Sequence, residues 1–423
     1  MSQAVMVAGT HSGCGKTTVT LALMCWFRQR GLTIAPFKAG PDFLDPMHLA
    51  HVADRPCYNL DTWMVGRQES RILLHRQSGD ADVAVVEGVM GLFDGQQGVG
   101  GPGSSADLAC LLRLPVWLVI DAGGMAGTVA PLVAGLVEEC VRQSVRVAGI
   151  IANRAGGEGH ARMLAGFLRE RHLPPLIGWL GHAKDCLAER YLGLVPPDKE
   201  RGPKYPTFQP LVDPLLLSDA LPTIANQAQG GGRRRLKGLH IAIAQDEAFR
   251  FLYPANLDWL REQGAALSFF SPIAGESIPQ ADALWLPGGY PELYAESLSR
   301  SRTLRSISAF CDSGRPVLAE CGGMMVLGRC IVDVEGRQYP MAGVSTHRYC
   351  MRPRLVDLGY RQTWDGLRGH AFHYAQREGE GRDAPAYELV QDGDQGWRYK
   401  GVRASWNHWY FPSAPETAAG LFQ

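Results

Sequence analysis

The chain has 423 residues, which is enough for about two or three domains with complete hydrophobic cores. Its 42 basic and 42 acidic residues balance, so global charge gives no argument for binding to nucleic acid or to another polyanion. Hydrophobic residues make up 46% of the chain, and no apolar run approaches the ~18 residues of a membrane span. We therefore expect a globular protein with neither a membrane nor a nucleic-acid partner.

The ten cysteines are scattered along the chain and include no Cys-x-x-Cys pair. In a chain of this length, such spacing favours reduced thiols over disulfides or a zinc site. The first three residues run directly into an apolar segment, so we expect no signal peptide. Together these features predict a cytoplasmic protein.

Short apolar runs alternate with longer helical patterns in the first half of the chain. We expect strands at residues 4–8, 33–38, 83–86, 116–120 and 147–153, and helices at residues 19–27, 128–144 and 160–171. Apolar strands without alternation, separated by helices, indicate a parallel sheet that is covered on both faces. Ligands bind such sheets at the carboxyl ends of the strands, which is where Lys38, Glu87 and Asp121 lie.

The segment GTHSGCGKTT at residues 9–18 lies between the first expected strand and the first expected helix. Its glycines let backbone N–H groups approach phosphate oxygens, and the helix N-terminus adds partial positive charge. Lys16 is expected to contact the β- and γ-phosphates of a nucleoside triphosphate, and the Thr17 hydroxyl to bind Mg²⁺. Thr10 stands where this pattern usually has a glycine. The predicted nucleotide-binding residues are Thr10, Gly13, Gly15, Lys16, Thr17 and Thr18.

Three acidic segments, at residues 38–48, 87–95 and 121–124, follow strand ends near this phosphate loop. Mg²⁺ in proteins takes one or two carboxylates together with nucleotide phosphates and waters. Taken alone, each carboxylate is as readily a turn or helix-cap residue. As a set beside Lys16 and Thr17, they favour a site for a magnesium nucleotide.

A change of composition separates the two halves of the chain. The segment NQAQGGGRRR at residues 226–235 has the composition of a flexible linker, and its arginines favour a solvated linker over a basic binding patch. We predict domains at residues 1–222 and 237–423, joined by a linker at residues 223–236. The second half is again α/β, with strands expected at residues 240–244, 283–286 and 316–319, helices at residues 255–263 and 303–312, and mainly strands and loops beyond residue 339.

Cys321 lies in the segment AECGGM at residues 319–324, after an expected strand. Taken alone it would be a core cysteine. A sharp strand-to-helix turn with small neighbours exposes a nucleophile, and a helix N-terminus lowers the pKa of a thiol, so we expect a reactive Cys321. The late His408 is the expected base. Backbone N–H groups for an oxyanion hole are expected at Gly288, Gly289 and Gly322.

The chain resembles the cobyrinic and hydrogenobyrinic acid a,c-diamide synthases. The resemblance rests on segments KAGPDFLDP at residues 38–46, EGVMGLFDG at residues 87–95 and RYLGLVP at residues 190–196, and it continues at residues 241–257. The early Gly9-Thr10 is similar to the phosphate loop of dethiobiotin synthetase. The implied fold is α/β with two domains, each a mostly parallel sheet flanked by helices. The first would be P-loop NTPase-like, and the second a class I glutamine amidotransferase domain.

The resemblance implies ATP- and glutamine-dependent amidation of the a- and c-acetate carboxylates of a corrin in cobalamin biosynthesis. Because hydroxide is a poor leaving group, ATP would convert each carboxylate to an acyl phosphate, which ammonia released at Cys321 and His408 would then displace. The resemblance assigns Mg²⁺ to Thr17, Asp45 and Glu87. It leaves as candidates for the substrate or a second metal Lys38, Asp42, His48, Asp94 and Arg190.

Two residues depart from the amidotransferase pattern. Tyr410 stands where class I glutaminases usually have a Glu, two residues after the His, that orients the imidazole. Ala371 replaces the Glu in a segment that resembles Gly-His-Glu-Phe-His-Tyr. Both changes leave the Cys–His pair intact, and they predict a weakly active glutaminase that also uses free ammonia.

Two other hypotheses stay open. A cobyric acid synthase or a nickel-sirohydrochlorin a,c-diamide synthase would amidate a related tetrapyrrole. A non-enzymatic ATP switch with an inactive amidotransferase domain would turn over ATP without a carboxylate acceptor, although such switches often carry a second lysine in the phosphate loop and this sequence has none there. A homodimer is compatible with the sequence, and the motifs do not distinguish cobalt-containing from metal-free corrins.

Overall fold

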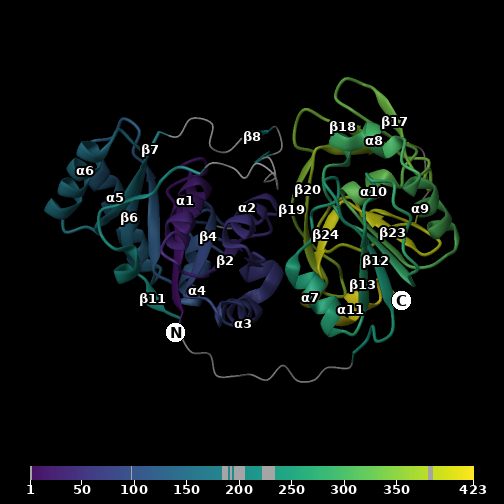
Figure 1. The fold of residues 1–423 in the computed structure, drawn as a ribbon, viewed down its shortest axis with the longest axis horizontal. Coiled ribbons are helices and arrows are strands. Elements are labelled where there is room, and N and C mark those ends of the chain that lie inside the picture. Colours follow the sequence, from purple (N-terminus) through teal and green to yellow (C-terminus); the bar gives the residue numbers. More distant parts are fainter. Residues whose placement is uncertain are drawn as a thin grey trace. The chain divides into compact units, whose positions relative to one another are not determined.

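The computed structural model describes residues 2–96, 98–182, 189–190, 193–194, 205–221, 234–379 and 384–423. The chain forms two compact units, Met1–Ala228 and Gln229–Gln423 (Figure 1). Most of the predicted linker, at residues 223–233, lies outside the described residues. Among the residues that the structure describes, no helix combines the length and the apolar character needed to cross a membrane.

The first unit is built on a mostly parallel sheet, as the alternation of apolar runs and helical patterns predicts. Its strand order is β10-β7-β6-β5-β1-β4-β2-β3, with β11 also paired to β1. The strands are β1 (Gln3–Gly9), β2 (Ile34–Ala39), β3 (Tyr58–Leu60), β4 (Val83–Gly91), β5 (Val116–Asp121), β6 (Val147–Ala155), β7 (Leu176–Gly181), β10 (Gln209–Pro210) and β11 (Asp219–Ala220). A separate antiparallel pair is formed by β8 (Glu189–Arg190) and β9 (Gly193–Leu194). Among the described strands of the main sheet, β10 and β11 pair antiparallel and the others pair parallel.

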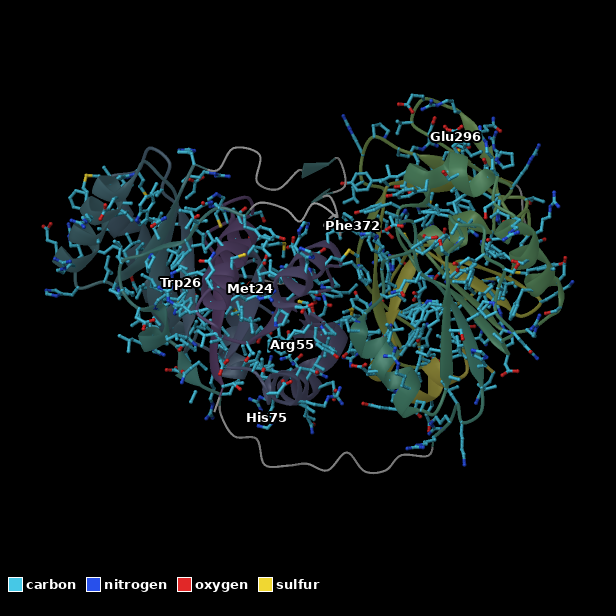
Figure 2. All side chains as sticks on the ribbon, in the orientation of Figure 1. Met24, Trp26, Arg55, His75, Glu296 and Phe372 are labelled. Carbon is cyan, nitrogen blue, oxygen red and sulfur yellow. The ribbon has the colours of Figure 1, made fainter. Side chains whose placement is uncertain are left out.

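Helices cover this sheet and bury its apolar strands. They are α1 (Lys16–Arg28), α2 (Leu44–Ala53), α3 (Arg67–Ser78), α4 (Ser105–Leu112), α5 (Val129–Arg142) and α6 (Glu158–Glu170), with single turns η1 (Thr62–Gly66) and η2 (Pro214–Leu217). Met24 and Trp26 on α1, labelled in Figure 2, belong to one buried cluster with strands β1 and β5. The ring of Phe27 lies 6.4 Å from that of Trp117 on β5, so α1 is fixed against the centre of the sheet.

The second unit has a sheet of order β13-β12-β14-β15-β23-β22, which is parallel except for β22. Its strands are β12 (His240–Ala244), β13 (Ala266–Phe270), β14 (Ala283–Leu286), β15 (Val317–Glu320), β22 (Trp397–Tyr399) and β23 (Val402–Ser405). The helical segments are α7 (Pro254–Glu262), η3 (Pro291–Tyr294), α8 (Ala295–Ser299), α9 (Thr303–Asp312), α10 (Gly322–Val326), η4 (Phe411–Ser413) and α11 (Pro415–Ala419). The order places β14 beside β15, so the loops that follow these two strands emerge at one edge.

Two small sheets complete the second unit, where we expected mainly strands and loops. One has the order β17-β16-β18-β21, and the other β19-β20-β24. The strands of these sheets are β16 (Cys330–Val332), β17 (Gln338–Pro340), β18 (Arg348–Met351), β19 (Asp357–Gln362), β20 (Arg368–His373), β21 (Ala375–Glu378) and β24 (Asn407–Tyr410). The strand pair β20 and β24 is antiparallel and places His370 opposite His408.

Candidate functional site

The phosphate loop joins β1 to α1, which begins at Lys16. Gly15 has a φ of 89°, a left-handed conformation that favours glycine, at the start of the helix. A Cβ on Gly9 would lie 2.4 Å from Cys14 Sγ and 2.7 Å from Lys16 Cγ. Cys14 and Lys16 pack so closely on the backbone of residue 9 that only a glycine fits there. The usual pattern has its glycine one residue later, where this chain has Thr10.

Replacing Gly9 with alanine is expected to push the Lys16 side chain out of place, because no real Cβ tolerates a 2.4 Å contact. We expect an increase of about tenfold in the KM for ATP and a loss of about 1–3 kcal/mol of unfolding free energy. Steady-state kinetics and thermal unfolding measure both effects. Gly135→Ala in α5 is the matched control, since a Cβ there meets nothing within 4 Å and a helical alanine should stabilise.

Two residues that the sequence analysis did not select brace the phosphate loop from β6. Asn153 Nδ2 donates to the Cys14 carbonyl at 2.9 Å, and Arg154 Nη2 donates to the Gly13 carbonyl at 3.2 Å. Arg154 also pairs with Asp121. Burial opposes ionisation of Asp121, but hydrogen bonds from Gly123 N and Arg154 outweigh it and lower the pKa of that carboxyl. Asp121 thus contacts Arg154, one of the two residues that hold the phosphate loop.

A chain of polar contacts connects the phosphate loop to the ends of β2 and β4. Thr17 Oγ1 donates to Glu87 Oε1 at 2.7 Å. The buried Lys38 places Nζ 3.7 Å from Glu87 Oε1 and 3.5 Å from Asp45 Oδ2, and donates to the Gly88 carbonyl at 2.7 Å. This follows from the register, in which Lys38 on β2 lies opposite Glu87 on β4. The structure therefore gathers Thr17, Lys38, Asp45 and Glu87 at one sheet edge.

Asp42 extends this group and lies two residues before the start of α2. Its carboxylate accepts from Leu44 N at 3.1 Å and from Asp45 N at 3.2 Å, as a helix cap does. Burial and then the neighbouring Asp45 raise the pKa of Asp42 to about 7. Burial and then Glu87 raise the pKa of Asp45. The crowded carboxylates favour a nearby positive charge, and the Lys38 ammonium supplies part of it. Although burial lowers the pKa of Lys38, these carboxylates outweigh that effect and raise it.

The residues present fit Mg²⁺. The hydroxyl of Thr17 and the carboxylates of Asp45 and Glu87 are oxygen ligands, and Glu87 Oε2 is buried with no hydrogen-bond partner among the described residues. Within the described ranges, no three His, Cys, Asp or Glu side chains converge closely enough to hold a metal by themselves. The remaining ligands would have to be nucleotide phosphates and waters, as Mg²⁺ sites commonly have.

The other predicted substrate contacts are not equally placed. His48 is buried on α2, with Nδ1 3.5 Å from the Tyr205 hydroxyl. Asp94 accepts from Gly91 N at 2.8 Å, which is a turn contact. Arg190 lies outside the residues whose side chains the structure describes.

Cys321 follows β15 on a sharp turn. Its φ of 45° and ψ of −107° are strained for a non-glycine residue, and its N–H donates to the Ser405 carbonyl at 2.7 Å. A Cβ on Gly322 would lie 2.7 Å from Pro291 Cδ and 3.1 Å from Gly289 N. The loop after β14 therefore packs tightly against the Cys321 turn.

The same loop contacts His408 on β24. A Cβ on Gly288 would lie 2.1 Å from His408 Cε1, so the imidazole lies directly over that glycine. Cys321 Sγ is 4.0 Å from the carbonyl of Phe372, which is labelled on β20 in Figure 2. Gly288 thus packs against His408, and Gly289 packs against Gly322 of the Cys321 turn; an oxyanion hole at Cys321 would need donors here.

The pKa of Cys321 is raised, contrary to our expectation of a lowered value. Burial is the main cause, and the nearby carboxyl groups of Glu292 and Glu320 add to it. Helix α10 has only five residues, so its N-terminus provides little compensating positive charge. Burial also places the pKa of His408 well below its ordinary value, with His370 and His373 contributing. Both shifts favour the neutral forms, a thiol at Cys321 and an uncharged imidazole at His408.

This state predicts how Cys321 reacts with iodoacetamide in the absence of glutamine. Because the thiolate is the nucleophile, the alkylation rate should rise about tenfold per pH unit between about pH 7 and 9 without a plateau. Mass spectrometry of the Cys321 peptide measures the rate, with the exposed Cys110 as an accessible reference thiol. A pH-independent rate down to about pH 6 would instead show a preformed thiolate–imidazolium pair.

Each of the two units matches a known protein family. Residues 240–415 match the CobB/CobQ-like glutamine amidotransferase domain, and residues 5–198 match the CobQ/CobB/MinD/ParA nucleotide binding domain. The chain is 39% identical to a cobyrinate a,c-diamide synthase of Herminiimonas arsenicoxydans, over 99% of this chain and 96% of that protein. It is also 39% identical to a hydrogenobyrinate a,c-diamide synthase of Pseudomonas aeruginosa, over 99% of this chain and 97% of that one. The chain belongs to the cobyrinate and hydrogenobyrinate a,c-diamide synthase family.

In this a,c-diamide synthase family member, His408, the expected base, lies beside groups that the sequence patterns did not indicate. The rings of His370 and His408 stack with centroids 5.1 Å apart, and the Tyr253 hydroxyl is 3.1 Å from His370 Nδ1. Tyr410, where a Glu is usual, is buried with its ring 5.9 Å from that of Tyr253. Ala371 is buried opposite Asn407. Tyr410 lies two residues from His408 and so shares its face of β24, whereas Ala371 pairs with Asn407 on the other face.

A buried carboxyl connects the end of β15, which precedes Cys321, to β24, which carries His408. Glu320, adjacent to Cys321, accepts from Trp409 N at 2.8 Å and from Trp285 Nε1 at 2.9 Å. Burial raises the pKa of Glu320 to about 8. Since Trp409 follows His408 directly, the bond from Trp409 fixes β24 relative to the turn that carries Cys321. No sequence pattern predicts this contact, because it joins residues 89 positions apart.

Proposed function

We propose that this chain amidates the a- and c-acetate carboxylates of cobyrinate or hydrogenobyrinate in cobalamin biosynthesis, using ATP, Mg²⁺ and glutamine. The observation that supports the proposal most strongly is the gathering of Lys38, Asp45 and Glu87 beside Thr17 at the end of the phosphate loop. Relatives that share nearly the full length of the chain carry the corresponding names. Other nucleotide-binding folds share the loop, so the proposal depends on this lysine and these carboxylates at its end.

The first unit has to activate an unreactive carboxylate. Lys16 and the loop's N–H groups would bind the ATP phosphates, with Mg²⁺ held by Thr17, Asp45 and Glu87. When bound, Mg²⁺ neutralises charge on the phosphates during transfer. A substrate carboxylate oxygen attacks the γ-phosphorus and ADP leaves. Lys38 would stabilise the anionic substrate carboxylate. Ammonia then attacks the acyl carbon, phosphate leaves and one proton is lost.

The second unit would supply that ammonia. The Cys321 thiol gives its proton to His408, and the sulfur attacks the side-chain amide carbon of glutamine. Backbone N–H groups of Gly288, Gly289 and Gly322 would stabilise the oxyanion. Ammonia leaves with the proton from His408, and water then hydrolyses the thioester to glutamate. Because the shifts favour neutral Cys321 and His408, the proton would pass to His408 as the sulfur attacks glutamine.

An assay with cobalt-loaded and metal-free corrins, run side by side, tests this function. Mass spectrometry should show two amides added per macrocycle, and the faster substrate identifies the metal state of the ring. Addition of four amides would indicate a cobyric acid synthase. Turnover of a nickel sirohydrochlorin alone would indicate the nickel-tetrapyrrole enzyme, and ATP turnover with no acceptor would indicate a switch.

Two further properties belong to the same proposal. The cysteines among the described residues are free thiols. Free thiols support a reducing compartment such as the cytoplasm. The balanced charge supports the absence of a nucleic-acid partner. A homodimer stays a proposal that light scattering coupled to size-exclusion chromatography would test directly.

A further inference from the structure

Met90 combines two unusual properties near the end of β4. Its φ of 47° is in the left-handed region, which side chains other than those of Gly, Asn and Asp rarely adopt. Its side chain is also 45% exposed, whereas the strand before it is buried. A single exposed apolar side chain is ordinary, but one that is held in a strained conformation is not.

Hydrogen bonds on both sides hold this conformation. Ser105 Oγ accepts from Val89 N at 2.8 Å and donates to the Val89 carbonyl at 3.0 Å. On the other side, Asp94 accepts from Gly91 N at 2.8 Å. Both neighbouring residues are therefore fixed, and the strain at Met90 is imposed by its surroundings. The contact with Gly91 N gives Asp94 the turn role that the sequence left open beside a ligand role.

The residues next to Met90 connect two parts of the synthetase site. A Cβ on Gly40 would lie 3.4 Å from Val89 Cγ2, so Val89 packs on the turn that leads to Asp42. A Cβ on Gly91 would lie 3.1 Å from the Thr10 carbonyl of the phosphate loop. Of the two neighbours of Met90, Val89 therefore packs on the turn before Asp42, and Gly91 packs on the phosphate loop.

We propose that Met90 is a substrate-positioning residue that contacts the apolar face of the tetrapyrrole ring. The inference deepens the proposed function and rests on it. A corrin is a broad apolar ring whose reacting carboxylates lie on flexible arms at its edge. The charged groups around Lys38 can hold an arm, but they offer nothing to the ring itself. An exposed thioether side chain adapts its shape to a large apolar surface.

The variants Met90→Gly and Met90→Leu test this. Glycine removes the side chain and accepts the positive φ, so Met90→Gly should raise the KM for the corrin about tenfold. The midpoint of thermal unfolding should stay unchanged or rise by about 2 °C, since strain is relieved. The KM for ATP and the glutaminase rate should not change. Met90→Leu keeps an apolar side chain, and its KM for the corrin should stay within about twofold.

Met163→Ala, which removes another exposed methionine from α6 of the same unit, is the control and should leave every constant unchanged. An unchanged KM for the corrin in Met90→Gly, in an assay where the wild type amidates the corrin, overturns the inference alone. A lowered unfolding midpoint with equal losses for ATP and corrin would show a purely structural role. If the wild type neither binds nor amidates the corrin, the proposed function fails, and the inference fails with it.

Discussion

Replacing Cys321 with alanine is expected to reduce glutamine-driven amidation by about 10⁴-fold or more and to leave ammonia-driven amidation unchanged. The thiol is the group that breaks the glutamine amide, whereas free ammonia needs only the activated carboxylate. Initial rates of amide formation with glutamine and with ammonium chloride measure the two activities. Cys311→Ala, which removes a buried thiol of α9 in the same unit, should retain both.

The division of labour between the two units depends on this result. Loss of both activities in a folded Cys321→Ala variant would contradict it, because the first unit would then need the intact thiol. Retention of glutamine-driven amidation would show that another residue hydrolyses glutamine. The reduced polarity around Tyr410 and Ala371 predicts that the wild type also uses ammonia readily, so the ammonia arm gives a strong signal.

Replacing Lys16 with alanine is expected to reduce amidation with either nitrogen source by roughly 10³-fold. Lys16 begins α1 and is largely buried, and burial lowers its pKa while Glu87 and Asp45 oppose that effect. Its ammonium is placed to offset charge on the phosphates during transfer, before either form of ammonia can react. Amide formation and phosphate release are measured together.

The exposed Lys237 provides the matched control, since Lys237→Ala removes a lysine far from the phosphate loop in sequence. It should change neither rate. Survival of ammonia-driven amidation in Lys16→Ala would contradict the assignment of the phosphate loop. Glutamine hydrolysis by Cys321 should persist in Lys16→Ala, which shows that the second unit is folded.

The parallel sheets were predicted well because buried strands and covering helices differ strongly in their apolar patterns. Strands β12 and β14 and helix α9 have the bounds that we expected. The predicted strand at residues 83–86 instead continues to Gly91, since pairing with β1 and β2 keeps Glu87 in the strand. The small antiparallel sheet of β19, β20 and β24 was expected only as strands and loops, because the pairing of β20 with β24 joins distant segments.

The site residues that could be predicted are those that lie in a short local motif. Residues such as Lys16 and Cys321 follow local turn patterns, and the strand register explains why Lys38 and Glu87 meet. Asn153 and Arg154 were missed because their contacts with the phosphate loop cross about 140 residues of sequence. The direction of the pKa shift at Cys321 was wrong because burial, which the sequence does not display, exceeds the effect of a short helix.

Transfer of oxygen from the substrate to phosphate tests the central claim most directly. A corrin whose a- and c-carboxylates carry ¹⁸O is incubated with the wild type, ATP, Mg²⁺ and ammonia, and the inorganic phosphate is analysed by mass spectrometry. An acyl phosphate mechanism predicts one labelled oxygen in phosphate for each amide formed, and two amides per macrocycle. Amide formation with unlabelled phosphate, or phosphate release with no amide, would contradict the account.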